Sequence, residues 1–117
     1  MLYRVGTTKE LPMIRSHLPE RVYEEVLRGV AILDCEYGAD RNYLLSGGYS
    51  LIAQTVDDLL MVKKAIDYDA HCCEWATTIG RDTGYISALY IINDDFSIML
   101  YMPKDIAPDA ILTELED

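Results

Sequence analysis

Residues 85–103 constrain the fold most, because two apolar runs flank a short polar break, Asn93-Asp94-Asp95. β-Branched and aromatic residues on both sides of such a break predict a β-hairpin. Pairing Asn93 with Phe96 sorts the side chains onto two faces: Leu89, Ile91, Phe96, Ile98, Leu100 and Met102 on the first, and Ala88, Tyr90, Ile92, Ser97, Met99 and Tyr101 on the second. Neither face is polar, which predicts a central hairpin covered on both sides, with Leu89, Ile91, Ile98 and Leu100 in the core. A three-residue turn would reverse the faces of one strand.

The other elements follow from apolar periodicity and from capping residues. The spacing predicts strands at 2–5, 30–37, 49–54 and 72–79, a short helix broken by Pro12, and helices over 19–29 and 56–66. A helix over 71–76 is the alternative for the start of the last of these strands. Thr55 with Asp58 has the spacing of a capping box, and Gly29 is placed to end the second helix. Pro108 opens a closing helix that runs to the last residues, with Ile111, Leu112 and Leu115 on its inner face.

This order, β-α-α-β-β-α-β-β-β-α, predicts an α+β fold. We expect one mostly antiparallel, mixed sheet with helices packed mainly on one face. Strand 49–54, helix 56–66 and strand 72–79 are suited to a crossover connection. At 117 residues, the chain is predicted to form a single globular domain over residues 1–117.

The charge is strongly acidic. Twenty Asp and Glu against ten Lys and Arg give a net charge of −10, and most of the excess lies in residues 42–117. This balance disfavours contact with nucleic-acid phosphates and with anionic lipid. Residues 1–4 do not resemble the start of a signal peptide, and no apolar run has the length of a membrane span. We therefore expect a cytoplasmic protein that binds neither nucleic acid nor membrane.

The segment 34–42 contains the weak candidates for catalysis, Asp34, Glu36, Asp40 and Arg41. On a strand, Asp34 and Glu36 would point to the same face about 7 Å apart, a separation that suits a carboxylate pair or a shared hard cation. The competing interpretation is a strand that runs out into solvent, with Arg41 paired to a nearby acid. The spacing matches no complete metal-site pattern.

The cysteines and histidines do not predict a metal site or a cofactor. Cys35, Cys72 and Cys73 make an odd count, and two of them are adjacent, so free thiols are expected rather than disulfides. On a strand, His71 and Cys73 would share one face while Cys72 points to the other, so this segment supplies too few of the four ligands of a structural zinc site.

Residues 36–42 (Glu-Tyr-Gly-Ala-Asp-Arg-Asn), 47–49 (Gly-Gly-Tyr) and 93–95 (Asn-Asp-Asp) carry a resemblance. Together they are similar to small uncharacterised acidic proteins that accompany bacterial conjugative or phage-like elements. The resemblance covers roughly residues 33–108 and implies an accessory protein, without implying an activity.

Three functions are compatible with these patterns. Nine tyrosines and a hairpin with two apolar faces favour a non-enzymatic interaction module. Its interface, for a homodimer or a protein partner, is predicted on the second hairpin face, with Tyr90, Ile92, Met99 and Tyr101. The alternatives are an acidic mimic of nucleic acid that antagonises a DNA-binding protein, and an enzyme that uses Asp34 and Glu36.

Overall fold

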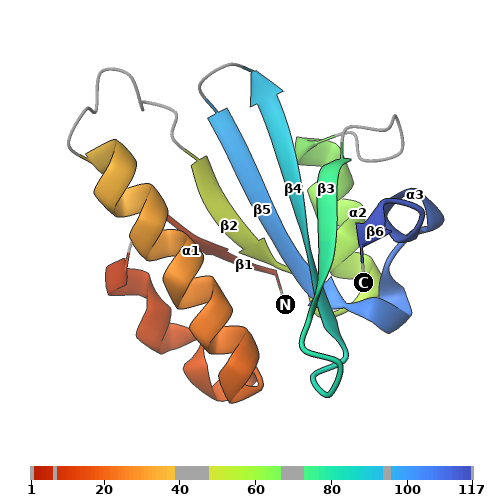
Figure 1. Cartoon of the computed structure of the whole chain (residues 1–117), viewed down its shortest axis with the longest axis horizontal. Coiled ribbons are helices and arrows are strands. Elements are labelled where there is room, and N and C mark those ends of the chain that lie inside the picture. The colour runs from red at the N-terminus through yellow and green to blue at the C-terminus, as the bar shows by residue number, and fades with distance from the viewer. Residues whose placement is uncertain (1, 7, 39–47, 67–72, 94–95, 117) are drawn as a thin grey trace.

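Figure 1 shows one mixed β-sheet with helices on both of its faces. The computed structural model describes residues 2–6, 8–38, 48–66, 73–93 and 96–116. Its elements in chain order, with η for a 3-10 helix, are β1 (Tyr3–Val5), η1 (Thr8–Met13), η2 (Arg15–His17), α1 (Glu20–Gly38), β2 (Gly48–Ile52), α2 (Val56–Ala65), β3 (Cys73–Ile79), β4 (Tyr85–Asn93), β5 (Phe96–Pro103), η4 (Lys104–Ile106), α3 (Asp109–Leu112) and β6 (Leu115–Glu116).

The hairpin of β4 and β5 lies at the centre of the sheet, as its two apolar faces predicted. The strand order is β1-β2-β5-β4-β3-β6. β5 pairs in parallel with β2 and antiparallel with β4, and β3 pairs antiparallel with β4 and in parallel with β6. The α+β class and the mixed sheet are therefore confirmed.

A β-bulge reverses the expected faces of β4. Asn93 pairs with Phe96 as predicted, but Ile91 pairs with Ser97, so β4 carries one extra residue between these two pairs. An extra residue shifts the alternation of side chains by one position. Residues 86, 88 and 90 of β4 consequently share a face with residues 98, 100 and 102 of β5. The predicted sorting is right for β5 and wrong for β4.

The core assignments change accordingly. Ile98 and Leu100 are buried as predicted. Ile91 is 48% exposed, so its assignment to the core was wrong, and Leu89 is half-buried. Tyr90 is fully buried on the face that also carries Leu100. The hairpin is thus central, but one of its faces is partly open.

Helix α1 continues through residues that we expected to form a strand. The prediction ended the helix at Gly29 and placed a strand over 30–37, whereas α1 reaches Gly38. Val22, Val26 and Val30 are four residues apart and all buried, so the helical stripe facing the sheet extends past Gly29. The apolar run at 30–33 resembles a strand locally, and the burial of Val30 in one core with Val22 and Val26 carries the helix past Gly29.

Helix α2 begins as the capping residues predicted. Thr55 Oγ1 accepts a hydrogen bond from the Asp58 N–H at 3.2 Å, and the Asp58 carboxylate accepts from the Thr55 N–H at 3.1 Å. The Gln54 N–H donates to the same carboxylate at 2.8 Å. Burial alone would raise the pKa of Asp58, but interactions that include these two N–H groups hold that pKa below its ordinary value.

Helix α2 connects two strands that are not neighbours. In the sheet, β5 and β4 lie between β2 and β3. β2 and β3 run in the same direction, because one parallel and two antiparallel pairings connect them. The helix therefore crosses over the central hairpin, as a crossover connection requires. Its buried residues Leu59, Val62 and Ile66 cover that hairpin.

The C-terminal residues leave the helical path early. α3 spans only Asp109–Leu112, and Leu115–Glu116 then forms β6 beside β3. The expected helix through the last residues was therefore too long, although Ile111 is buried as predicted. Leu115 and Glu116 pair with Ala76 and Thr77 of β3. This pairing gives their backbone groups hydrogen-bond partners that a frayed helix end would lack.

Two apolar cores lie on opposite faces of the sheet, so the helices are not mainly on one face. The first core joins α2 and α3 to the sheet through Leu51, Leu59, Val62, Ile86, Ala88, Tyr90, Ile98, Leu100, Met102 and Ile111. The second joins α1, η1 and their flanking residues through Val5, Leu11, Ile14, Leu18, Val22, Tyr23, Val26, Val30, Ile52, Ile79 and Tyr101. Within the described ranges, no helix is both long and apolar enough to cross a bilayer.

Candidate binding site on the open sheet face

The first half of α1 is anchored over one end of its sheet face. Its buried valines pack with Ile52, Ile79 and Tyr101 of three strands. Arg21 Nη1 lies 3.6 Å from Asp82 Oδ1 in the turn between β3 and β4. Gly80 of that turn has φ 62, and a Cβ there would lie 2.9 Å from the Arg21 guanidinium. A side chain at position 80 would therefore be strained and would also displace Arg21.

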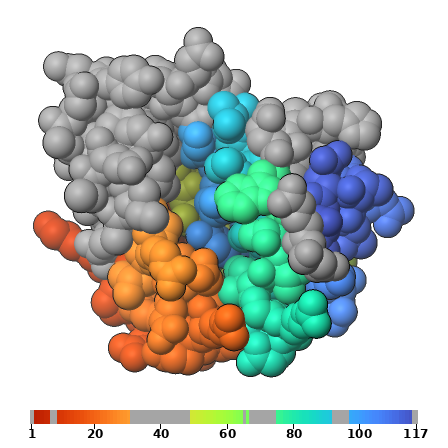
Figure 2. Space-filling view, viewed as in Figure 1, coloured from red at the N-terminus to blue at the C-terminus, as the bar shows by residue number. Residues whose placement is uncertain are grey.

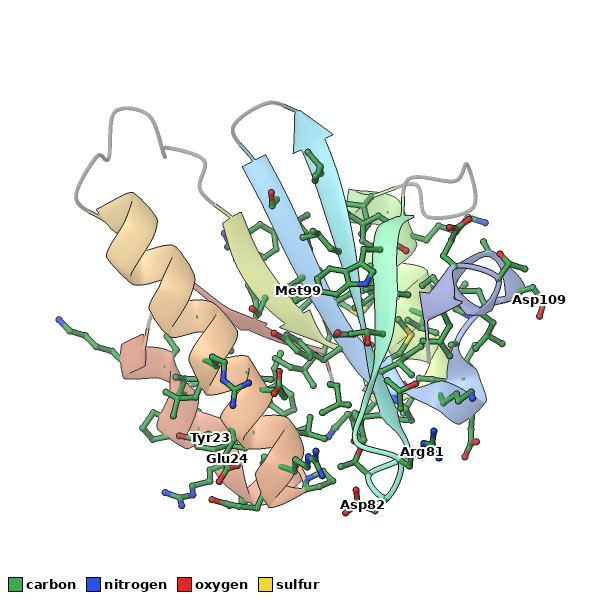
Figure 3. All side chains as sticks on the ribbon, in the orientation of Figure 1. Tyr23, Glu24, Arg81, Asp82, Met99 and Asp109 are labelled. Atoms are coloured by element: carbon green, nitrogen blue, oxygen red, sulfur yellow. The ribbon has the colours of Figure 1, made fainter. Side chains whose placement is uncertain are left out.

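Beyond this end, the same face of the sheet is only partly covered. Figure 2 shows a hollow between α1 and β3, with β2, β5 and β4 visible at its floor. The register places Trp75 opposite Leu89, Leu89 opposite Met99, and Met99 opposite Ser50, which makes a row across four strands. Met99 lies near the middle of the sheet (Figure 3). The row is therefore part of the face toward α1.

Four apolar residues of this face, Trp75, Leu89, Ile91 and Met99, make up what we call the open-face patch. Ile91 follows Leu89 by two residues on β4 and so points the same way. Trp75 is 46% exposed and Ile91 48%, while Leu89 and Met99 are half-buried. Large apolar side chains on a regular strand cannot turn toward the interior, because the pleat fixes their face. The patch is thus a preformed apolar surface.

Tyr101 lies at the boundary between the patch and the anchored part of α1. It is 3% exposed, and an added Cβ at Gly29 would lie 2.8 Å from its Oη. The helix therefore approaches β5 closely because position 29 has no side chain. Burial, and then the nearby Glu25 carboxylate, raise the pKa of Tyr101 well above its ordinary value, although the Ser50 hydroxyl opposes this.

The raised pKa of Tyr101 predicts an alkaline loss of stability. The unfolded chain loses the phenol proton near pH 10, whereas the folded chain retains it to higher pH. The contribution of Tyr101 is therefore fully present below about pH 10 and falls as pH rises above that value. We expect the free energy of unfolding to decline more steeply above about pH 10 in the wild type than in Tyr101→Phe. Denaturant titrations of both proteins across this range measure the difference, and parallel curves would contradict it.

The row next to the patch does not add to its exposed surface. It consists of Thr77, Ser87 and Tyr101, and of these Ser87 and Tyr101 are buried. The exposed chemistry of this part of the sheet is therefore the apolar area of the open-face patch, which is the kind of surface that other proteins contact.

The chain matches no family model, no curated protein and no solved structure in the comparisons made. The likeness to proteins of mobile elements stays a prediction, and the function is argued from the site itself.

The predicted carboxylate pair does not have the backbone that it required. Asp34 and Glu36 belong to helix α1 instead of a strand. The predicted spacing of about 7 Å assumed a strand, and the side chains of these two residues lie outside what the structure describes. Asp40 and Arg41 lie outside the described residues. The strand that this pair required is replaced by helix, and an enzyme based on Asp34 and Glu36 stays a prediction.

The predicted interface does not form one surface. Tyr90 is fully buried against α2, and Tyr101 is buried beneath α1 on the opposite face. The side chain of Ile92 lies outside the described residues, whereas Met99 does belong to the open-face patch. The bulge explains this outcome, because it places Leu89 and Ile91, instead of Tyr90, on the same face of the sheet as Met99. Association with a second chain stays a prediction, but it can no longer rest on a surface that includes Tyr90 and Tyr101.

Sequence reasoning missed Trp75 as a site residue. It is the single tryptophan of the chain and lies in a strand that was predicted correctly, so its half-exposed position was the missing information. His71 and Cys72 lie outside the described residues. Among the residues that the structure describes, no three His, Cys, Asp or Glu side chains gather as a metal ion would need.

Proposed function

We propose that this chain is a non-enzymatic interaction module that binds a basic segment of a partner protein on the open-face patch. The observation that carries the proposal is the half-exposed pair Trp75 and Ile91, adjacent to Leu89 and Met99 on a rigid sheet. Contiguous apolar surface of this kind marks interaction sites, and tryptophan and methionine are enriched in them. The resemblance to accessory proteins of mobile elements is compatible with such a role.

The charge of the chain defines the chemistry of the partner. A net charge of −10 attracts basic segments over long distances and repels acidic ones. A segment that alternates basic and apolar residues would therefore combine steering by charge with burial of the patch.

Calorimetric titration with two designed peptides tests this proposal. One is a tryptophan-free amphipathic peptide of lysine and leucine, and the other has glutamate in place of every lysine. We expect the basic peptide to bind and the acidic peptide not to bind. Ile91→Glu should weaken the affinity for the basic peptide on the order of tenfold, because it places a charge in the apolar contact.

The position of the substitution separates the patch from simple attraction between charges. Ile91→Glu makes the chain more acidic, so binding by charge alone would become tighter. Val56→Glu adds the same charge at a residue of α2 that is 58% exposed on the other side of the sheet, and it should leave the affinity for the peptide unchanged. Equal affinity of the peptide for Ile91→Glu and Val56→Glu would overturn the assignment to the patch.

The acidic mimic of nucleic acid is the second candidate, and the net charge favours it. Such a mimic would bind basic ligands through its acids, with a strong dependence on salt and no dependence on Ile91. The same titrations therefore distinguish it from the interaction module.

A further inference from the structure

Helix α2 carries a second stripe of apolar residues on the side that faces away from the sheet. Leu59, Val62 and Ile66 face the sheet and are buried. Leu60 is 53% exposed and Met61 56%, and Asp57 and Lys64 are exposed on the same side. Positions 57, 60, 61 and 64 have the spacing i, i+3, i+4, i+7, so they form one stripe along the helix.

The order of residue types along this stripe is self-complementary. It runs from an acid through two apolar residues to a base. A second copy laid antiparallel, with its two-fold axis between positions 60 and 61, places Leu60 on the other copy's Met61. The same arrangement places Asp57 on the other copy's Lys64, twice by symmetry. A parallel copy would instead oppose like charges at both ends.

We propose that two copies of this chain associate through the outer stripes of α2, packed antiparallel about a two-fold axis. Isologous contacts of this type are the commonest in small oligomers. The apolar pair lies at the centre, and the ion pairs lie at the rim, where they determine orientation more than affinity. This contact is independent of the open-face patch, which belongs to the opposite face of the sheet.

The size of the contact predicts a weak dimer. Ten residues of helix span about 15 Å, and a contact of that length buries less than the roughly 800 Å² per partner of a standard interface. Repulsion between two chains of charge −10 opposes it further. We therefore expect association at high protein concentration and in moderate salt, which screens this repulsion.

Asp57 and Lys64 also have a simpler role, since an acid at the first turn and a base at the last turn of α2 complement the helix dipole. The test therefore uses pairing between variants rather than the loss of one residue. The variants are Asp57→Lys, Lys64→Asp and the double variant D57K/K64D. Thermal unfolding of each monomer measures any change in the helix itself.

Sedimentation equilibrium over a wide concentration range gives the dimer dissociation constants. Each single variant opposes like charges at both symmetry-related positions, so we expect its dimer to be weaker on the order of tenfold. The double variant should recover the wild-type constant. An equimolar mixture of the two single variants should form a heterodimer, because every pair is then complementary.

Asp57→Lys makes the chain less acidic, so relief of general repulsion alone would strengthen its dimer, contrary to this expectation. A wild-type chain that stays monomeric at millimolar concentration would overturn the proposal. Dimers that are equally strong in all variants, or a mixture that does not associate, would do the same.

Discussion

Leu100→Ala is expected to lower the free energy of unfolding by about 2–5 kcal/mol, the range for truncation of a buried leucine. Leu100 is fully buried on β5, between Leu51 of β2 and Ala88 of β4. Helix α2 covers this face, so the truncated side chain leaves a cavity that the rigid sheet fills only in part. Denaturant unfolding monitored by far-ultraviolet circular dichroism measures the loss.

Leu60→Ala is the matched control for that measurement. It removes the same atoms from a residue that is 53% exposed, and its effect should stay within about 0.5 kcal/mol. Similar unfolding midpoints for Leu100→Ala and the wild type would contradict the assignment of this face to the core.

Gly29→Ala is expected to destabilise the protein by about 1 kcal/mol, although alanine is the better helix former. In a helix interior, alanine stabilises by roughly 0.5–1 kcal/mol relative to glycine. Here the added methyl would lie 2.8 Å from Tyr101 Oη, and overpacking of a buried contact costs about 1–3 kcal/mol. The buried Tyr101 ring cannot swing into solvent to relieve the clash.

In a chain that also carries Tyr101→Phe, the effect of Gly29→Ala on the free energy of unfolding should reverse its sign. Apart from the neighbouring residues and the backbone of the helix itself, Tyr101 Oη is the one atom of the described residues that lies within 4 Å of the added Cβ. Without it, Gly29→Ala should stabilise by about 0.5–1 kcal/mol. A double-mutant cycle in denaturant measures this coupling. Additive effects would mean that α1 does not approach β5 at this point.

The elements that local chemistry determines were predicted correctly from the sequence. Thr55 and Asp58 form the capping box within four residues of chain, so no distant contact is needed to place the start of α2. The hairpin turn is local as well, and Asn93 does pair with Phe96. The burial of Leu100 follows from its position on β5 next to this turn.

The rest depends on contacts between distant residues. Residues 30–37 continue helix α1, although their local sequence favours a strand. The close approach of Gly29 to Tyr101 is likewise not visible in the sequence around either residue. The bulge before Asn93 leaves no distinctive residue in the sequence, yet it exchanges the two faces of β4. The open-face patch depends on that bulge, so Trp75 and Ile91 could not be assigned to it beforehand.

The fluorescence of Trp75 tests the central claim most directly, because it is the single tryptophan and lies in the open-face patch. Acrylamide quenching is measured in the free protein and in the presence of the tryptophan-free lysine–leucine peptide. We expect efficient quenching in the free protein, and protection with a blue-shifted emission once the peptide is bound, but no protection in Ile91→Glu. A tryptophan that is already shielded in the free protein, or whose quenching is unchanged when the peptide binds, would contradict a binding site on this face.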